Sequence, residues 1–298
     1  MQDIGKSVLD KLRAKAKATS TPYQQCLQLF FQEEFLRRLS RSRFSSNLIL
    51  KGGLFIYTLT DFQSRATVDV DFLLHQQPST PEEVQAMIEE ILQAQTGNDF
   101  IQMTAKGFQE ISAQRKYKGI SAQIIGQIKN VRVPFDVDMG VGDVIVPKAE
   151  RRAIQTQLPG YEAPEILVYS LESTIAEKFD AILQRFELNG RMKDFYDIYY
   201  LSRTFDFDGE LLQKAIKASL QNRGTEHGRD SFEEIKRLPE HPDMQTRWSH
   251  FLKKLEKPSI DFALVVEELA VFLEPVYIAM VDKKSYCSRW NCGERTWK

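Results

Sequence analysis

Two aspartates separated by a single residue, Asp69 and Asp71, have the residue type and spacing of a metal site. They lie in ATVDVDFLL (66–74), where acidic and apolar residues alternate with the period of a β-strand. Both carboxylates therefore project from one face, whereas Val68 and Phe72 project from the other and are expected to pack on the core. Like charges on one face repel unless a cation lies between them, and hard oxygen ligands suit Mg²⁺ bound with substrate phosphates. A half-exposed edge strand shows the same alternation, so the spacing alone favours neither interpretation.

A second predicted strand, VRVPFDVD (131–138), repeats this pattern with Asp136 and Asp138 on one face. A third carboxylate beside Asp69 and Asp71 would share the metal and orient or deprotonate an attacking hydroxyl. Because both aspartates of this strand point to the same face, the pattern does not decide between them.

Lys51, Gly52 and Gly53 follow a short apolar strand expected at 47–50 and precede a helix expected at 54–59. Glycines at a strand-to-helix turn let backbone N–H groups close around phosphate oxygens, and a helix N-terminus favours negative charge. Most Gly-Gly pairs are simply turns. A phosphate-binding turn, a helix and then paired carboxylates is a much rarer order, and it supplies the positioning and charge stabilisation that phosphoryl transfer needs.

Two helices predicted in the second half carry charged residues on or beside their buried faces. Lys178 falls at the edge of an apolar stripe in the helix 170–186, where it either snorkels to solvent or contacts an anion. Asp194 points toward the buried side of the next helix. It either stabilises the first helical turn, forms an ion pair with Lys178 or Arg191, or contacts a bound nucleotide.

The elements that would position these residues follow the order helix, strand, helix, strand, helix, several strands and then mostly helices. Helical spacing extends over 1–45, a helix begins at Thr80, further strands are expected at 110–118, 120–129 and 131–138, and helices dominate from Ser170 onward. This order predicts an α+β fold. A sheet domain with N-terminal helices (1–160) is expected to precede a mostly helical C-terminal domain (161–298) that completes the active-site cleft.

The composition excludes several other classes of protein. Hydrophobic residues make up 42% and charged residues 27% of the 298 residues, which argues against a disordered or fibrous chain. No apolar run approaches the ~20 residues of a membrane helix. Cys26, Cys287 and Cys292 are expected to be free thiols in a reducing cytoplasm.

The formal net charge of −1 does not indicate a nucleic-acid partner, so contact with RNA would need a local basic face. Basic residues do gather near the N-terminus, where they are usually solvated helix faces but would be the natural phosphate-contacting surface for an RNA acceptor. They are Lys11, Arg13, Lys15, Lys17, Arg37, Arg38, Arg41 and Arg43.

The order Gly-Gly, Asp-x-Asp, third Asp resembles the polymerase-β-like nucleotidyltransferase superfamily. More narrowly, LKGGLFIYTLTDFQSRATVDVDF (50–72) resembles the AbiEii-like toxins of abortive-infection, or type IV toxin–antitoxin, systems, whose signature runs Lys-Gly-Gly and then Arg-x-Ser/Thr-x-Asp-x-Asp. DMGVGDVIVP (138–147) resembles the third-carboxylate strand of that family. AEKFDAILQRFELNGRMKDFYDIYYL (176–201) resembles its Glu-Lys helix followed by Arg-x-Lys-Asp-x-Tyr-Asp. The resemblance covers roughly residues 25–280. One departure is the gap between Gly53 and Asp69, which is longer than usual in the superfamily.

The resemblance implies a polymerase-β-like mixed sheet with flanking helices and a Mg²⁺-dependent enzyme, with Mn²⁺ as an alternative metal. It implies that the metal is bound by Asp69, Asp71 and Asp138, and that the DMGVGD match selects Asp138 over Asp136. It implies that a nucleoside triphosphate is bound by Lys51, Gly52, Gly53, Arg65 and Lys178. Lys178 and Asp194 would join the three aspartates in catalysis.

The same resemblance implies an RNA acceptor, foremost the 3′ end of tRNA, and growth arrest restrained by a cognate antitoxin encoded nearby. A second enzymatic interpretation is transfer of a nucleotide to a protein hydroxyl. A third is a non-catalytic regulatory module that binds nucleoside triphosphate on the same fold. Retention of three carboxylates argues against that module, because a protein that only binds nucleotide has no need of the third.

Overall fold

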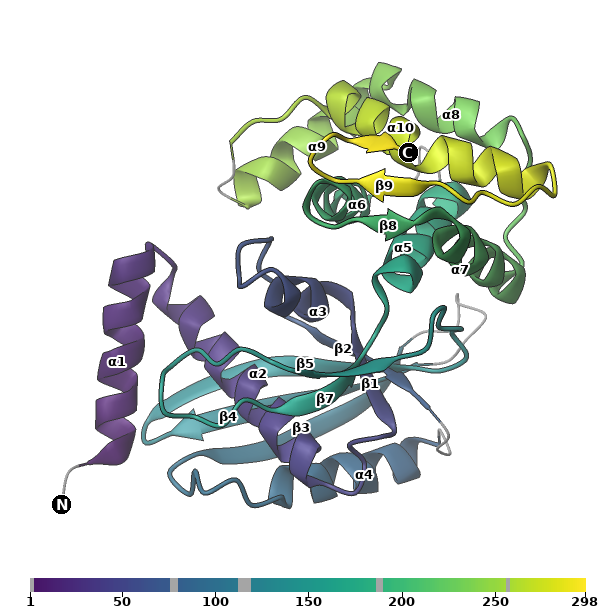
Figure 1. Ribbon diagram of the computed structural model, residues 1–298. Coiled ribbons are helices and arrows are strands. Elements are labelled where there is room, and N and C mark those ends of the chain that lie inside the picture. Colours follow the sequence, from purple (N-terminus) through teal and green to yellow (C-terminus); the bar gives the residue numbers. More distant parts are fainter. Residues whose placement is uncertain (1–2, 76–79, 112–118, 186–189, 256–257) are drawn as a thin grey trace. The chain divides into compact units, whose positions relative to one another are not determined.

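The computed structural model describes residues 3–75, 80–111, 119–185, 190–255 and 258–298. The chain forms two compact units. The sheet unit contains the residues up to Gly142 together with Ala149–Tyr169, and the helical unit contains Asp143–Lys148 together with Ser170–Lys298 (Figure 1). The predicted α+β class, a mixed sheet with flanking helices followed by a mostly helical part, is confirmed.

The sheet unit is built on seven strands in the order β3-β4-β5-β2-β1-β7-β6. β1 runs parallel to β7 and β2 runs parallel to β5, whereas the other neighbours are antiparallel. The strands are β1 (Leu48–Lys51), β2 (Val70–Leu74), β3 (Gln102–Ile111), β4 (Gly119–Ile128), β5 (Val131–Gly140), β6 (Glu150–Ala153) and β7 (Glu165–Val168). β2, which carries Asp71, is therefore the central strand.

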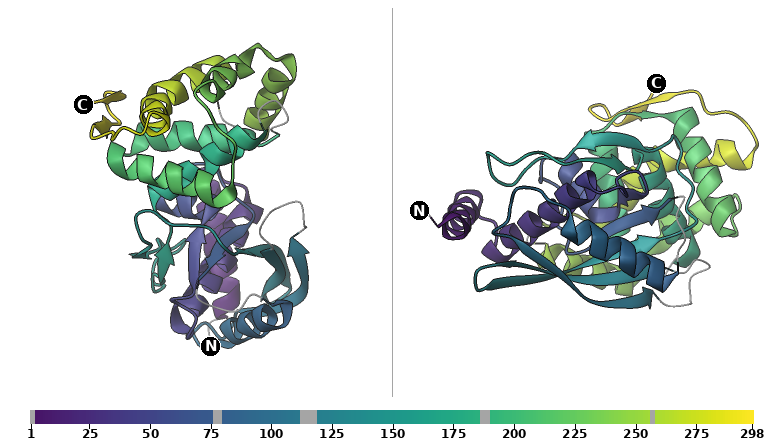
Figure 2. Two further views of the ribbon diagram at one scale, coloured as in Figure 1. Left: turned by 90° about the vertical axis from the view of Figure 1, so that its right-hand side faces the viewer. Right: turned by 90° about the horizontal axis from the view of Figure 1, so that it is seen from below.

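Helices α2 (Tyr23–Arg41) and α4 (Pro81–Gln93) cover one face of this sheet, and α1 (Ile4–Thr19) packs on α2 (Figures 1 and 2). The ring of Phe35 on α2 lies 6.1 Å from that of Phe72 on β2 and 6.3 Å from that of Phe135 on β5. Because successive side chains alternate between faces, the aspartates next to these aromatic residues point to the opposite face. Within β2 and β5, the apolar half of the predicted alternation thus packs in the core.

Most of the predicted elements of the sheet unit are present. The strands expected at 120–129 and 131–138 are β4 and β5, and Thr80 is the N-cap of α4, in a capping box with Glu83. The strand expected at 110–118 lies mostly outside the described residues, whereas β3 was missed. β3 is an edge strand with mostly exposed side chains, so the apolar alternation that reveals a strand is weak there.

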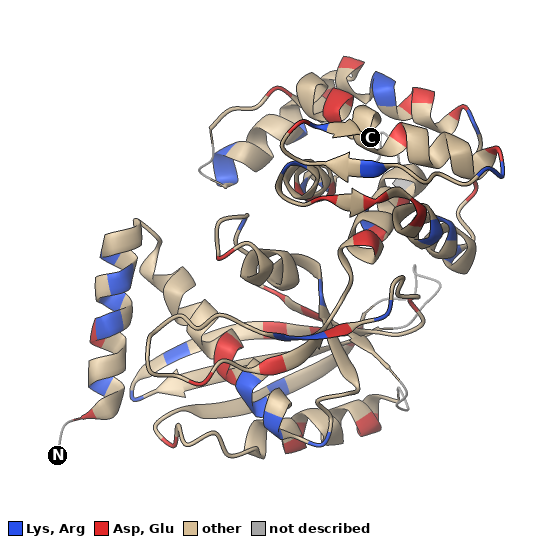
Figure 3. Cartoon of the chain, viewed as in Figure 1, with Lys and Arg blue, Asp and Glu red and all other residues tan. Residues whose placement is uncertain are grey.

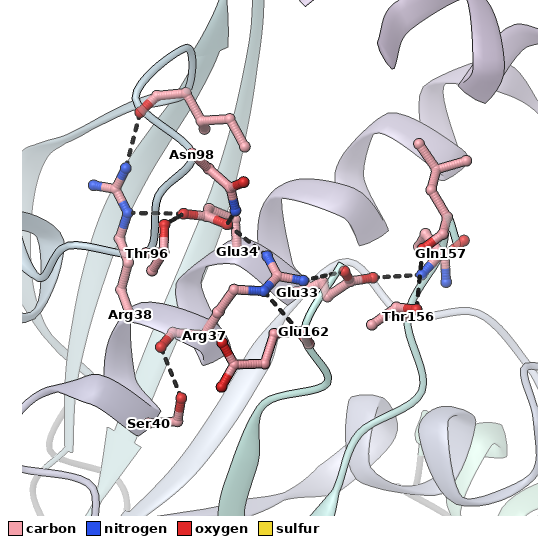
Figure 4. A network of polar contacts seen from close by, with 12 residues as sticks. Glu33, Glu34, Arg37, Arg38, Ser40, Thr96, Asn98, Thr156, Gln157 and Glu162 are labelled. Atoms are coloured by element: carbon pink, nitrogen blue, oxygen red, sulfur yellow. Dashed lines mark hydrogen bonds and ion pairs between the residues drawn. The ribbon is translucent and has the colours of Figure 1, made fainter. Parts of the chain in front are cut away.

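Four charged residues of α2 form a buried network (Figure 4). Arg37 donates to Glu34 at 2.5 Å, to Glu33, and to the carbonyl oxygen of Glu162 at 2.9 Å. Arg38 donates to Glu34 at 3.3 Å. Arg37 is 1% exposed and Arg38 is 9% exposed, so the expectation that both belong to an exposed basic face is wrong. Their donors are directed to buried acceptors that fix α2 within the sheet unit.

The helical unit is organised around α10 (Phe262–Val281), which contacts α6, α7 and α8. Its other elements are α5 (Leu171–Arg185), α6 (Met192–Thr204), α7 (Gly209–Arg223), α8 (Ser231–Arg237), the 3₁₀ helix η2 (Leu238–Glu240), α9 (Pro242–Lys254) and a small antiparallel sheet of β8 (Phe207–Asp208), β9 (Arg289–Asn291) and β10 (Thr296–Trp297). The Trp297 ring stacks on Phe272 of α10, with centroids 5.8 Å apart. Among the described residues, no helix is both long and apolar enough to span a membrane.

Candidate active site

The sheet registers align four polar residues in one row across the adjacent strands β4, β5, β2 and β1. Asp71 on β2 is the Cα partner of Asp138 on β5 and of Lys51 on β1, and Asp138 is in turn the partner of Ser121 on β4. Neighbouring strands lie about 4.8 Å apart, and residues directly opposite each other share a face of the sheet. The row Ser121–Asp138–Asp71–Lys51 therefore gathers residues that are far apart in the sequence.

Asp69 lies just before β2 and outside the strand ladder. It precedes Asp71 by two residues, and its negative charge contributes to the raised pKa of the Asp138 carboxyl group. Val68 is 59% exposed, so the expectation that it packs on the core is wrong. The strand begins only after Asp69, and the carbonyl oxygen of Val68 instead accepts hydrogen bonds from Gln28 and Gln32 of α2, each at 2.7 Å.

Gly52 and Gly53 begin α3 (Gly52–Leu59). They lie directly against the segment that contains Thr67 and Asp71. Gly52 has a φ of +68°, and a Cβ atom built on it would lie 2.8 Å from Cγ of Asp71. A Cβ atom on Gly53 would lie 2.9 Å from Oγ1 of Thr67. Only glycine permits both the left-handed backbone and the close approach. The turn thus presents the first backbone N–H groups of a helix, a favourable place for phosphate, beside the row.

We expect Gly52→Ala to lower, by about 100-fold, the nucleotide transfer that the sequence predicts, because the added Cβ overlaps Asp71 and must displace its carboxylate. The matched control is Gly160→Ala. Gly160 also has a positive φ, +88°, but nothing lies within 4 Å of its added Cβ. Both variants should lose about 1–3 kcal/mol of stability through backbone strain, measured by thermal unfolding. Equal transfer rates in the two variants would show that the close approach has no role.

Two cations of the sheet unit belong to the predicted nucleotide-binding residues. Nζ of Lys51 lies 5.6 Å from the centroid of the Tyr169 ring, within the range of a cation–π interaction. Arg65 is 9% exposed and belongs to the segment that leads into Asp69. Because Lys51 is the Cα partner of Asp71, it ends the row with a positive charge.

Electrostatics single out Asp138 within the row. Burial raises the pKa of its carboxyl group, the neighbouring hydroxyl group of Ser121 lowers it, and the negative charges of Asp71, Asp69 and Asp136 raise it further. A carboxylate with a raised pKa is a better proton acceptor than an ordinary aspartate. Ser121 was missed by sequence reasoning, since only the register of β4 with β5 shows that it faces Asp138.

The donor set fits a Mg²⁺ ion that is completed by its substrate. Within the described residues, no group of three or more His, Cys, Asp or Glu side chains is arranged to hold a metal by itself. Mg²⁺ is usually held by one or two carboxylates plus substrate phosphates and water, so a complete protein cage is not required. Asp71 and Asp138, opposite each other on parallel strands, meet that requirement.

A second cluster of charged residues lies in the helical unit. Nζ of Lys178 on α5 donates to Asp194 Oδ1 at 3.1 Å and to Asp197 Oδ2 at 2.6 Å, both on α6. Arg191 Nε lies 3.0 Å from the other carboxylate oxygen of Asp194. Lys178 is 9% exposed, so the snorkelling alternative is wrong, and the predicted ion pairs of Asp194 with Lys178 and Arg191 are both present.

The helical unit also contains an arginine that sequence reasoning missed. Arg223 on α7 lies 2.9 Å from Asp143, 3.4 Å from Glu177 and 3.2 Å from Asp180. Asp180 is fully buried and also accepts a hydrogen bond from Thr225. Because Asp143 ends the DMGVGD motif, the network ties the last residue of this motif to α5 and α7. Nothing in the spacing of Arg223 distinguishes it from a solvated helix residue.

Comparison with known proteins agrees with this architecture. The solved structure of the nucleotidyltransferase toxin MenT4 from Mycobacterium tuberculosis H37Rv is similar, with a TM-score of 0.56 at 16% sequence identity over 93% of this chain and 99% of that one. The structure of JHP933 from Helicobacter pylori matches with a TM-score of 0.47 at 13% identity over 86% of this chain and 95% of that one. No curated protein sequence matches the chain.

The family model of the nucleotidyl transferase AbiEii toxin of type IV toxin–antitoxin systems matches residues 34–268. This range contains the Gly-Gly turn, the three candidate aspartates and the Lys178 cluster. The MenT4 likeness supports the fold, and the family match extends over most of the chain. The chain is a nucleotidyltransferase that belongs to the AbiEii family of type IV toxin–antitoxin toxins.

Proposed function

We propose that the protein transfers a nucleotide from a nucleoside triphosphate to an acceptor hydroxyl, and that Asp69, Asp71 and Asp138 form its metal site. The observation that carries the proposal is the direct opposition of Asp71 and Asp138 beside the Gly52 turn. Mg²⁺, or alternatively Mn²⁺, would neutralise the triphosphate charge when bound. The metal would be held by Asp71 and Asp138, with Asp69 next to them.

In the proposed reaction the acceptor oxygen attacks the α-phosphorus of the nucleotide, the bond to the β-phosphate oxygen breaks, and pyrophosphate leaves. Asp138 takes the proton of the acceptor hydroxyl, a role that its raised pKa favours. Gly52, Gly53, Lys51 and Arg65 hold phosphate oxygens through backbone N–H groups and positive side chains. Lys178 adds positive charge to the triphosphate, and Asp194 positions it through their ion pair.

We further propose that the acceptor is RNA, foremost the 3′ end of tRNA. α1 supports this choice because lysine and arginine recur along it (Figure 3). Its exposed basic residues are Lys6, Lys11, Arg13 and Lys17. Arg37 and Arg38 are not available for this role, since they are buried with carboxylates. Membership of the family supports two further proposals, a cytoplasmic site of action and a cognate antitoxin encoded nearby that restrains growth arrest.

The test is incubation with each labelled nucleoside triphosphate, Mg²⁺ and either total tRNA or lysate protein, with Asp71→Asn as the inactive control. Label in tRNA that depends on Asp71 supports the proposal. Label in protein would replace RNA by a protein hydroxyl as the acceptor. Label in neither, for any of the four nucleotides, would contradict the proposed reaction.

The choice of Asp138 over Asp136 gives a separate prediction. We expect Asp138→Asn to lower transfer roughly 100-fold, because it removes the proton acceptor opposite Asp71. Asp136→Asn should stay near the wild-type rate, because the register pairs Asp71 with Asp138 and not with Asp136. On its other side, Asp136 lies opposite Gln123 on β4. Initial rates of both variants decide the matter. An inactive Asp136 variant beside an active Asp138 variant would show that the third carboxylate has been assigned to the wrong residue.

A further inference from the structure

The segment just before β2, which carries Asp69, is anchored by two glutamines of α2. The registers of β2 with β1 and β5 begin within the strand itself, so Val68 and Asp69 lie outside the ladder. The side chain of Val68 is mostly exposed and does not anchor the segment in the core. Its carbonyl oxygen instead accepts one hydrogen bond from the side-chain amide of Gln28 and another from that of Gln32, each at 2.7 Å.

These two hydrogen bonds restrain more than a single atom. The carbonyl group of Val68 and the backbone nitrogen of Asp69 belong to one planar peptide unit, which ends at Cα of Asp69. An oxygen that accepts two hydrogen bonds has both of its lone pairs directed, which fixes the orientation of that plane. The donors are four residues apart, on one face of α2, and the buried charged network holds that helix in place (Figure 4).

Gln32 is costly for the fold, which argues that its hydrogen bond has a function. The side chain is fully buried, yet within the described part of the chain its Oε1 atom has no hydrogen-bond partner. A buried acceptor without a partner destabilises a protein, and an apolar side chain of similar length avoids that cost. The contact that compensates for burying this amide is the hydrogen bond to Val68.

We propose that Gln28 and Gln32 are positioning residues, which hold Asp69 near Asp71 before a metal ion or nucleotide binds. Two carboxylates repel each other, so a loosely held segment would place Asp69 farther from Asp71 in the empty site. Bringing it back would then cost part of the metal affinity, whereas a segment fixed by α2 has met this cost on folding. The inference rests on the proposed function and deepens it, because it concerns how the metal site is prepared.

The experiment compares Gln28→Met, Gln32→Met and the double variant with the wild type. Mn²⁺ binding to the full-length protein without nucleotide is measured by electron paramagnetic resonance of the free ion. We expect the double variant to bind Mn²⁺ about 10-fold more weakly, and each single variant about 3-fold more weakly because one donor remains. The matched control is Gln25→Met. Gln25 is also half-buried on α2, but its amide donates to the hydroxyl of Tyr57 at 3.2 Å, so Mn²⁺ affinity should stay unchanged.

The Mg²⁺ dependence of transfer separates positioning from damage to the fold. In the double variant, the Mg²⁺ concentration for half-maximal transfer should rise about 10-fold, whereas the rate at saturating Mg²⁺ should stay within about twofold of wild type. Saturating metal draws the segment into its bound position, because the ion favours that state. The melting temperature of Gln32→Met should be equal or raised, since the unpaired buried acceptor is gone. A role in the fold alone would instead lower the melting temperature and leave Mn²⁺ affinity unchanged.

Wild-type Mn²⁺ affinity in the folded double variant, or an equal loss in Gln25→Met, overturns the inference. Should the variants at Gln32 fail to fold, Gln28→Met decides, because its half-buried side chain tolerates the change, and an unchanged affinity there overturns the inference as well. Asp71→Asn separates this result from the proposed function. An active Asp71→Asn contradicts the metal site, whereas an inactive Asp71→Asn beside a double variant with normal Mn²⁺ binding contradicts only the role of the two glutamines.

Discussion

Asp71→Asn is expected to abolish nucleotide transfer while leaving the protein folded. Asp71 is an inner member of the row, opposite both Asp138 and Lys51, and it lies against the Gly52 turn. The amide has the shape of the carboxylate but lacks its charge, so it is a poor ligand for a hard cation. Transfer should fall to the level of a reaction without enzyme, and added Mg²⁺ or Mn²⁺ should not restore it.

Most substitutions in a protein core lower the stability, whereas Asp71→Asn is expected to leave it unchanged or to raise it slightly. Asp71 and Asp69 both act on Asp138 with like charge, so removing one charge relieves repulsion in the folded state. Thermal unfolding without divalent metal should give an equal or slightly raised melting temperature. Asp69→Asn should behave in the same way, and Asp136→Asn is the matched control with a charge removed from the same face. Full activity in Asp71→Asn would refute the metal assignment.

The chemistry of single elements was predictable from the sequence, but their pairing was not. Alternation of Asp and apolar residues predicted that Asp71 and Phe72 face opposite sides, because side-chain direction in a strand is a local property. The same pattern left Asp136 and Asp138 equivalent. The structure distinguishes them through the parallel register of β2 with β5, which sets Asp71 opposite Asp138. Register depends on packing between distant segments, so no local pattern contains it.

Charged residues show a second limit of sequence reasoning. Arg37 and Lys178 both belong to patterns that are typical of solvated or snorkelling side chains. In the structure they are 1% and 9% exposed, because carboxylates on the same or a neighbouring helix compensate their charge. Helical periodicity shows which residues share a face but not which element covers that face. The α6 helix, which covers Lys178, could not be assigned to it from spacing alone.

The burial of Lys178 changes what its substitution should do. A snorkelling lysine would be removed at little cost in stability, but Lys178 is enclosed by Asp194 and Asp197. Lys178→Met removes the cation that both buried carboxylates share, and Arg191 remains beside Asp194. Breaking a buried ion pair from one side typically destabilises by about 3–5 kcal/mol. We expect a loss of that size in chemical denaturation, whereas Lys217→Met, at an exposed lysine on α7, should change stability little.

A double variant separates the chemistry of Lys178 from this structural effect. Lys178→Met combined with Asp197→Asn removes one charge of each sign, leaves Asp194 paired with Arg191, and should recover part of the lost stability. If Lys178 acts on the triphosphate, the double variant folds but stays inactive at both limiting and saturating nucleotide, because the missing charge cannot be replaced. If transfer returns together with stability, Lys178 serves the fold alone. Single-turnover assays below the melting temperature, with the folded fraction checked by circular dichroism, distinguish the two outcomes.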